Sequence, residues 1–306
     1  MSPSLQDRFV AALLGHALGD AIGAPFEGLS AEAIARDLGG ARNRISLPPR
    51  ETLCYTDDTQ MLIGVAECLV VCGRVDAQVL LQRFVANFEV ARGYGQGVRQ
   101  LIEAAAAGAD AEGLATLVFP GGSYGNGAAM RATPVGLLFH KDVDKVVREA
   151  RRSALPTHSH PLGVEGAVLF AAAVAICLRD VPFERNAFFS ELGSLAVEEE
   201  YQWQLRTAAR LSPSDRIPFG SSLPAHRSVV SALCCFANHP DSFLDAVITA
   251  VSLGDDTDTL AGMAGALVGA RHGTSALPTA HLAQLENKGK GVDYLRGLAI
   301  NLHARL

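Results

Sequence analysis

Two short runs of carboxylate and hydroxyl residues have the clearest capacity for chemistry in this sequence. The run LGDDTDT, Leu253–Thr259, places Asp255, Asp256 and Asp258 between two apolar segments. The run YTDDT, Tyr55–Thr59, repeats the same residue types much earlier in the chain. Like charges this close repel one another, and burying bare carboxylates is costly without a positive partner. If the runs converge, they form an oxygen-rich site suited to Mg²⁺ or Ca²⁺.

A purely structural role for the two runs is the alternative. Asp and Thr are common N-cap residues, and each run stands directly before an apolar stretch with helical spacing. A cap needs one side chain, whereas each run carries surplus carboxylates. For the two runs together we therefore favour metal binding.

One further carboxylate, Glu27, lies where the first helical segment breaks. The segment Gly19–Gly28, GDAIGAPFEG, has three glycines and a proline and leaves Asp20 and Glu27 near the C-terminal end of that helix. A carboxylate at a helix C-terminus gains nothing from the helix dipole. A lone Glu in a loop is usually solvated surface, so only neighbouring acidic groups would give Glu27 a chemical role.

Glycine-rich stretches and a histidine pair supply candidate ligand contacts. RGYGQGV, Arg92–Val98, is the first stretch, and FPGGSYGNGAAMR, Phe119–Arg131, is the denser one. Backbone amides between glycines can form a nest for phosphate, although such loops are more often plain turns. Neither stretch is a Walker loop or a Rossmann fingerprint. In PTHSHP, Pro156–Pro161, we favour hydrogen bonding by the two histidines over metal binding.

Helical periodicity dominates the chain, and no alternating β-branched runs occur, so the predicted fold class is all-α. Ser4 and Asp7 form a capping pair for the first helix, and Asp76 caps a later one. Leu211–Ala225 is polar with three prolines and reads as a surface loop, potentially a rim of the site. Helices are expected over Ser4–Ile22, Asp142–Ser153, Pro161–Leu178, Asn186–Arg210, Val229–Phe236, Phe243–Leu253 and Leu260–Ala270, with one or two more within His281–Leu306.

Composition restricts the class of protein. The chain has 306 residues, 49% of them hydrophobic, and no Pro/Gly/Ser-rich linker, so we expect one domain over residues 1–306. Its net charge of −6 and lack of basic clusters argue against direct nucleic-acid binding. The longest apolar run, Gly166–Leu178, is shorter than the about 20 residues of a membrane span. Without a signal-peptide pattern, and with six cysteines that form no CxxC pair, we expect a cytoplasmic protein with reduced cysteines and no membrane contact.

Taken together and in order, these motifs resemble those of the ADP-ribosylglycohydrolases. The resemblance is carried by GDAIGAPFEG, YTDDTQM, RGYGQGV, GSYGNGAAMR, the histidine of THSHP and SLGDDTDTLAGMAGALVGA, which span about residues 15–270. It is nearest to the branch similar to the ADP-ribosylserine hydrolase that also degrades poly(ADP-ribose). Two departures stand out: Asp255 occupies a position where Gly is common, and the segments after Glu27 and at 211–225 match poorly.

The resemblance implies a compact, orthogonal all-α helical bundle with two Mg²⁺ ions in a cleft for the ADP-ribose moiety. The implied metal ligands are Thr56, Asp57, Asp58, Asp256, Asp258 and Thr259, with Glu27 as the catalytic carboxylate. The glycine loop would hold the diphosphate and adjoining ribose, and other residues would line the cleft or stack on adenine. These implied substrate contacts are Gly95, Gly97, Phe119, Gly122, Ser123, Tyr124, Gly125, Asn126 and His158.

The activity implied is magnesium-dependent hydrolysis at ribose C1″, foremost of ADP-ribosylserine and also of poly(ADP-ribose), by a monomer. ADP-ribosylarginine and O-acetyl-ADP-ribose are alternative substrates for the same fold. A non-catalytic ADP-ribose binder or structural protein is a second class of alternative, disfavoured because every implied ligand position and Glu27 are present. A magnesium phosphohydrolase with an all-α carboxylate site is the third.

Overall fold

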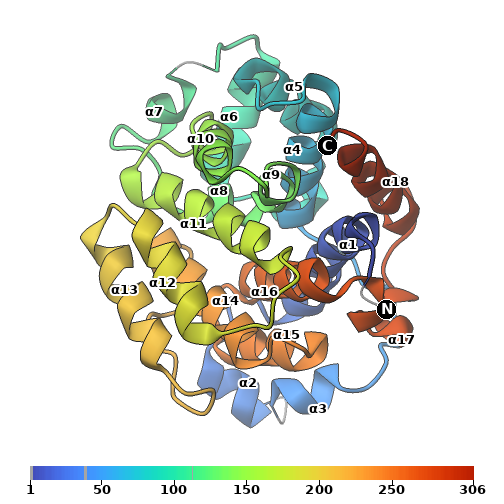
Figure 1. The fold of residues 1–306 in the computed structure, drawn as a ribbon. Coiled ribbons are helices and arrows are strands. Elements are labelled where there is room, and N and C mark those ends of the chain that lie inside the picture. Colours follow the sequence, from blue (N-terminus) through green and yellow to red (C-terminus); the bar gives the residue numbers. More distant parts are fainter. Residues whose placement is uncertain (1–2, 38–39, 112) are drawn as a thin grey trace.

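The computed structural model describes residues 3–37, 40–111 and 113–306. Within these ranges it contains helices and three isolated bridges but no strand, which confirms the predicted all-α class (Figure 1). The helices are α1 Leu5–Gly23, η1 Ala24–Phe26, α2 Ala31–Asp37, α3 Ala41–Ile45, α4 Asp57–Cys72, α5 Ala77–Asn87, η2 Val90–Arg92, α6 Gln96–Ala106, α7 Leu114–Val118, α8 Gly127–Met130, α9 Thr133–Leu138, α10 Val143–Ala154, α11 Pro161–Cys177, α12 Arg185–Leu195, α13 Glu199–Arg210, α14 Ala225–Asn238, α15 Phe243–Ser252, α16 Thr257–His272, η3 Thr274–Ala276, α17 Thr279–Leu282 and α18 Val292–His303.

The close pair of α1 and α16 is the centre of the fold. A methyl group added at Gly19 of α1 would lie 2.2 Å from the carbonyl oxygen of Ala261 in α16, and one at Gly15 would lie 2.5 Å from that of Gly265. Only glycine permits this approach, because any side chain would overlap the facing backbone. The contact brings the C-terminal end of α1 against the first turn of α16, so the segment that carries Glu27 lies beside the second acidic run.

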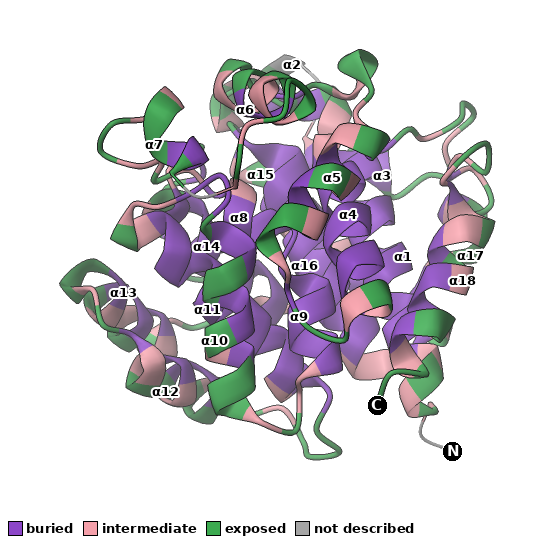
Figure 2. Cartoon of the chain, turned by 90° about the horizontal axis from the view of Figure 1, so that it is seen from above, coloured by how far each residue is buried: buried purple, intermediate pink, exposed green. Residues whose placement is uncertain are grey.

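The hydrophobic core surrounds this pair. Helices α1, α4, α11, α14 and α16 are buried along most of their length, while the outer helices expose one face (Figure 2). The segment Leu5–Phe26 is long and apolar enough to cross a membrane by length and composition, but 89% of its apolar window is buried inside the protein. Its packing against α16 and α18 is that of a core helix.

Local signals at the helix ends were predicted correctly. The Ser4 hydroxyl accepts a hydrogen bond from the Asp7 amide at 3.1 Å, and an Asp76 carboxylate oxygen accepts one from the Val79 amide at 3.1 Å. Each of these caps satisfies a backbone donor that the first turn of a helix leaves unpaired. The two acidic runs lie at the starts of α4 and α16, as their position before apolar stretches indicated.

The prediction of one helix over Asn186–Arg210 is wrong. The chain forms α12 and α13 instead, separated by a break at residues 196–198. The buried Glu165 carboxylate of α11 accepts hydrogen bonds from the Val197 amide at 2.9 Å and from the Glu198 amide at 3.0 Å. Those amides would be paired within a continuous helix, so a distant side chain determines the break.

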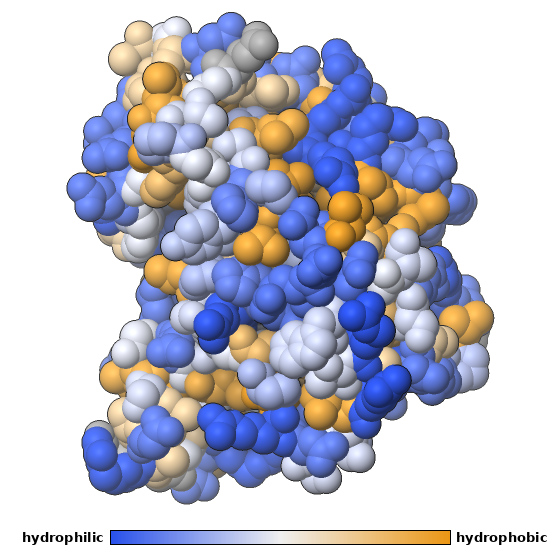
Figure 3. All heavy atoms as spheres, turned by 90° about the vertical axis from the view of Figure 1, so that its left-hand side faces the viewer, coloured by the Kyte–Doolittle hydropathy of each residue, from blue (hydrophilic) through white to orange (hydrophobic). Residues whose placement is uncertain are grey.

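All six cysteines are free, and Cys68, Cys177, Cys234 and Cys235 are buried, whereas Cys54 is exposed. On the side of the molecule that carries α12 and α13, hydrophobic side chains are interspersed with hydrophilic ones (Figure 3).

Candidate metal centre and ligand cleft

The structure brings carboxylates from three segments together. Ligand oxygens of Glu27, Asp256 and Asp258 all lie within 4.8 Å of one another. The first acidic run adjoins them, because the Asp258 charge acts on both Asp57 and Asp58. Asp58, Asp256 and Asp258 are buried, whereas Glu27 is exposed at the edge of the group. We call these five residues the acidic cluster.

The acidic cluster is electrostatically strained without a cation. Burial and then the Asp258 charge raise the pKa of Asp57 to about 7 and the pKa of Asp58 well above its ordinary value. The same causes, in the same order, raise the pKa of Asp256 and of Glu27. Asp58 Oδ2 is buried without a hydrogen-bond partner among the described residues. Oxygen donors of this kind fit a hard divalent cation, which would relieve both the repulsion and the unpaired oxygen.

Helix capping accounts for only one member of the two runs. The Thr56 hydroxyl accepts a hydrogen bond from the Asp58 amide at 3.3 Å, as an N-cap residue does. Asp256, at the N-cap position of α16, makes no side-chain capping bond. Thr259 follows in the first turn, where its amide donates to Asp258 Oδ1 at 2.9 Å. The surplus carboxylates are therefore not needed as caps, in agreement with the interpretation of the runs as ligands.

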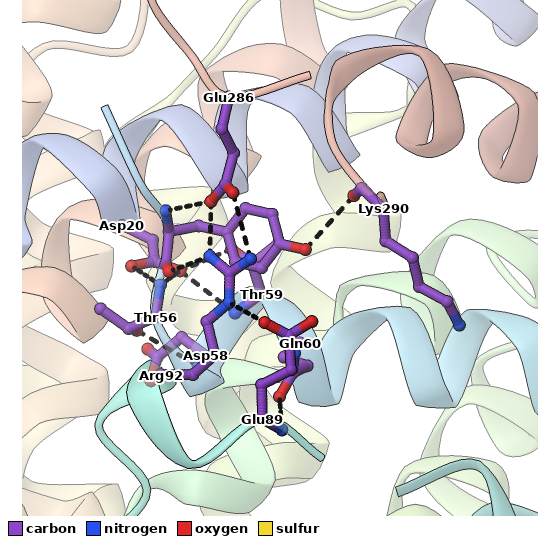
Figure 4. Close-up of polar contacts among 10 residues, drawn as sticks. Asp20, Thr56, Asp58, Thr59, Gln60, Glu89, Arg92, Glu286 and Lys290 are labelled. Atoms are coloured by element: carbon purple, nitrogen blue, oxygen red, sulfur yellow. Dashed lines mark hydrogen bonds and ion pairs between the residues drawn. The ribbon is translucent and has the colours of Figure 1, made fainter. Parts of the chain in front are cut away.

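A buried carboxylate of α1, outside the set of predicted site residues, positions the first run. Asp20 accepts hydrogen bonds from the Thr56 amide at 3.0 Å, the Thr59 amide at 3.1 Å and the Thr59 hydroxyl at 2.5 Å (Figure 4). Burial, followed by the Asp258 charge, raises the pKa of Asp20 to about 8. Asp20 thus holds the start of α4 against the end of α1.

An ion pair on the other side of the first run also constrains it (Figure 4). Arg92 donates to both carboxylate oxygens of Glu286, at 2.5 and 3.1 Å, and to the Tyr55 carbonyl at 2.8 Å. Its guanidinium lies 4.0 Å from the centre of the Tyr55 ring. Glu286 in turn accepts a hydrogen bond from the Tyr55 amide at 3.0 Å. The backbone just before the acidic pair is therefore fixed by residues far away in sequence.

The second run is held by hydrogen bonds on both sides. The Asp256 amide donates to the Ser221 carbonyl at 3.0 Å, so the end of the 211–225 loop lies at the site, as predicted for a rim. Asp255 exchanges two backbone hydrogen bonds of 2.8 Å with Gly28 and Leu29, which fasten the Glu27 loop to this run. Asp255 has a φ of 60°. Glycine is favoured in that conformation, and Asp is among the residues that tolerate it.

The dense glycine loop joins the acidic cluster directly. Asn126 donates from Nδ2 to Asp256 Oδ2 at 2.5 Å and to the Ser228 hydroxyl at 2.9 Å. Gly122 has a φ of 77°, and a methyl group there would lie 2.4 Å from the His160 backbone nitrogen. The Ser123 hydroxyl accepts from the Gly125 amide at 3.2 Å. The loop therefore lies between the acidic cluster and the start of α11.

The remaining predicted contact residues differ in their exposure and in the residues they pack against. Tyr124 is exposed, with its ring beside those of His160 and His226. Phe119 packs against Gly97, where a methyl group would lie 2.2 Å from the ring. Gly95 is exposed, and a methyl group added there would have no heavy atom of the described residues within 4 Å. His158 is buried behind the loop.

Comparison with known proteins decides the family. The ADP-ribosylglycohydrolase family model matches residues 1–306. The chain belongs to the ADP-ribosylglycohydrolase family. ADP-ribosylhydrolase ARH3 of Gallus gallus is 32% identical over 320 residues, which cover 89% of this chain and 87% of the relative. An uncharacterized protein of Archaeoglobus fulgidus is 30% identical and covers 98% of this chain and 97% of its own.

A solved structure supports the assignment. It is described as an ADP-ribosylglycohydrolase-related protein complex and matches with a TM-score of 0.74 and 28% identity over 98% of both chains. The resemblance seen in the motifs is thus confirmed. This ADP-ribosylglycohydrolase is a hydrolase that acts on ADP-ribosylated substrates, in a family that depends on metal, and its acidic cluster is a candidate metal site.

Sequence reasoning missed the residues that brace the ADP-ribosylglycohydrolase site. Asp20 was detectable in principle as an acid within an apolar helix pattern. Arg92 stood inside a motif, but its partner Glu286 lies in a polar segment with no distinguishing signal. Ser221 contacts the second run through its carbonyl and through its hydroxyl, which lies 3.1 Å from Asp255 Oδ2, but a single serine in a polar loop carries no distinguishing signal.

Proposed function

We propose that this ADP-ribosylglycohydrolase is a Mg²⁺-dependent enzyme that cleaves the bond at ribose C1″ of ADP-ribosylserine. One observation carries the proposal: the acidic cluster, with the exposed Glu27 at its edge, is hydrogen-bonded through Asn126 to a glycine loop. A cation site beside a phosphate-type nest suits a ligand with both a diol and a diphosphate. The form of the GSYGNGAAMR motif and the similarity to ARH3 support the serine linkage.

The residues that would hold two Mg²⁺ ions are those at the helix starts. They combine carboxylate and hydroxyl oxygens, the donor set that Mg²⁺ prefers. Bound Mg²⁺ would supply positive charge that orients the ribose hydroxyls and stabilises charge in the transition state. The proposed ligands are Thr56, Asp57, Asp58, Asp256, Asp258 and Thr259.

Glu27 is the residue we assign to proton transfer. Cleavage at C1″ gives the sugar oxocarbenium character and requires a proton for the leaving oxygen and a water as nucleophile. Among the five members of the acidic cluster, Glu27 is the exposed one, so it can reach a substrate. Burial and the Asp258 charge raise its pKa, the direction that suits a carboxyl group acting as a general acid.

The glycine loop would bind the rest of the nucleotide. Gly122, Ser123, Gly125 and Asn126 offer amides and side-chain groups without blocking the approach of a diphosphate. Tyr124, exposed beside them, offers a ring face to the ligand. We assign Gly95, Gly97, Phe119 and His158 to the wall of the same cleft.

The test measures ADP-ribose release from serine-linked and arginine-linked ADP-ribosyl peptides and from O-acetyl-ADP-ribose, in Mg²⁺ and in EDTA. We expect release from the serine peptide in Mg²⁺ and none in EDTA. Glu27→Gln should retain ADP-ribose binding but lose about 10³-fold in turnover, the usual scale of a general acid–base group. Glu32→Gln, an exposed carboxylate nearby, is the matched control and should be unchanged.

Each other outcome has a definite meaning. Full activity of Glu27→Gln would contradict the role of Glu27, and undiminished release in EDTA would contradict metal dependence. Release from the arginine peptide or the acetyl ester alone would overturn the serine linkage while leaving the reaction class intact.

A further inference from the structure

A fully buried arginine lies behind the glycine loop without full hydrogen bonding. Arg131, directly after α8, donates from Nη2 to the Ser153 carbonyl and to the Thr157 hydroxyl, both at 2.7 Å. Its Nε and Nη1 have no partner among the described residues. Burial lowers the pKa of Arg131 to about 9, so the guanidinium remains charged at neutral pH. The guanidinium also lies 4.8 Å from the centre of the Phe84 ring, and the Thr157 hydroxyl is the one side-chain oxygen of the described residues to which it donates a hydrogen bond.

That hydroxyl can give its hydrogen in only one good direction. Thr157 Oγ1 accepts from Arg131 and lies 2.7 Å from His158 Nδ1, whereas the Ala154 carbonyl is 3.5 Å away. A hydroxyl has a single hydrogen to donate, and hydrogen bonds between oxygen and its acceptors weaken beyond about 3 Å. The Thr157 hydrogen is therefore directed at Nδ1, which must act as the acceptor. The ring proton of His158 is then on Nε2.

The Nε2 edge of His158 faces the glycine loop. A methyl group added at Gly127 would lie 3.1 Å from Nε2, and one added at Gly125 would lie 3.4 Å from it. Burial, and then the Arg131 charge, lower the pKa of His158 to about 3. The imidazole is consequently neutral across the physiological pH range and offers one N–H at this edge.

We propose that Thr157, with Arg131 behind it, holds His158 in the Nε2–H tautomer, so that Nε2–H donates a hydrogen bond to a phosphate oxygen of the ligand in the glycine loop. The phosphate identity rests on the proposed function. Thr157 is a positioning residue in this arrangement, because it acts through His158 rather than on the ligand. The arrangement supplies a hydrogen-bond donor that keeps its proton and carries no charge.

The first test reads the tautomer directly in the ligand-free protein. Long-range ¹H–¹⁵N correlation of ¹⁵N-histidine-labelled protein distinguishes Nδ1–H from Nε2–H, and His158→Gln identifies the His158 signals. We expect Nε2–H in the wild type and in Thr157→Ser, which keeps the hydroxyl. Thr157→Val has nearly the same shape without the hydroxyl, and should show a mixture of tautomers. An Nδ1–H tautomer in the wild type would overturn the proposal.

The second test measures binding of ADP-ribose and ADP by calorimetry. Thr157→Val should weaken both about tenfold, the scale of one hydrogen bond to a charged group, and Thr157→Ser should stay within about twofold. Equal affinities of Thr157→Val and Thr157→Ser would show that the hydrogen bond from Thr157 to His158 does not affect ligand binding. That result would overturn the proposed contact between His158 and the phosphate. If the wild type binds neither nucleotide, the proposed function fails, and the NMR result still confirms or refutes the tautomer.

Discussion

The two acidic runs contribute to the same acidic cluster but are held in place by different means. The first run, at the start of α4, is braced by polar side chains: Asp20 on one side and the Arg92–Glu286 pair on the other. The second run, at the start of α16, also accepts side-chain hydrogen bonds from Asn126 and Ser221. Unlike the first run, it is in addition held by the packing of α16 on α1, where glycines allow contact of backbones. We therefore expect loss of a polar contact at the first run to cost less stability than loss of the helix packing behind the second run.

This difference predicts that substitutions near the two runs change different properties of the protein. Substitutions behind the second run should act mainly on the free energy of unfolding. Substitutions around the first run should act on the site as well, because they release a short segment rather than the core. The predictions below test this contrast, beginning with the largest expected effect.

The packing behind the second run should be the most sensitive. Gly19→Val places its first side-chain atom 2.2 Å from the Ala261 carbonyl oxygen, so α1 and α16 must separate. We expect a loss of about 4 kcal/mol in the free energy of unfolding, measured by urea denaturation. Gly297→Val in α18 is the matched control, since nothing lies within 4 Å there, and should cost less than about 1 kcal/mol. Equal losses of stability in the two variants would contradict the importance of the α1–α16 contact.

Breaking the bracing of the first run should have a smaller effect on stability. Arg92→Met leaves Glu286 largely buried and without its cationic partner, which should cost about 3 kcal/mol and impair turnover. Arg179→Met is the control, because Arg179 pairs with Glu191 through two hydrogen bonds in the same geometry but at the exposed surface. There solvent screening reduces the loss to below about 1 kcal/mol. A variant at Arg92 with wild-type turnover would show that the ion pair does not position the site.

The metal-free protein should lose stability as the pH rises. The pKa of Asp20 is raised to about 8 and that of Asp57 to about 7, so the folded state retains protons that the unfolded state has already released. The stability that these two protonated carboxyl groups contribute is fully present below their ordinary pKa near 4 and is lost as the pH rises through about 8. Denaturation in EDTA between about pH 7 and pH 9, above the ordinary histidine pKa, should show a loss of about 2 kcal/mol. Saturating Mg²⁺ should reduce this loss. A stability that increases with pH in EDTA would contradict the raised pKa values of these carboxyl groups.

Residue patterns were sufficient for the parts of the fold that depend on neighbours in sequence. The caps at Ser4 and Asp76, the helical starts at both acidic runs and the all-α class follow from local hydrogen bonding and apolar spacing. The break between α12 and α13 was missed because Glu165, more than 30 residues earlier, pairs with the amides at the break. Tertiary contacts of this kind override local propensity.

The same distinction between local and tertiary contacts applies to the site. Carboxylates crowded within each run could be recognised as a candidate metal site from their chemistry alone. Their bracing could not, because Arg92 and Glu286 are 194 positions apart and meet only where the segment that carries Glu286 hydrogen-bonds to Leu53, shortly before α4. The tautomer of His158 likewise depends on Arg131 and Thr157 meeting in three dimensions.

The most direct test of the central claim is whether both acidic runs serve one metal centre. Calorimetric titration of Mg²⁺ into the wild type should give two sites, and Asp57→Asn from the first run and Asp256→Asn from the second should each weaken binding at least about tenfold. Asp144→Asn, an exposed carboxylate of α10, should bind Mg²⁺ like the wild type. Unchanged Mg²⁺ binding in either of the two cluster variants would contradict a shared centre.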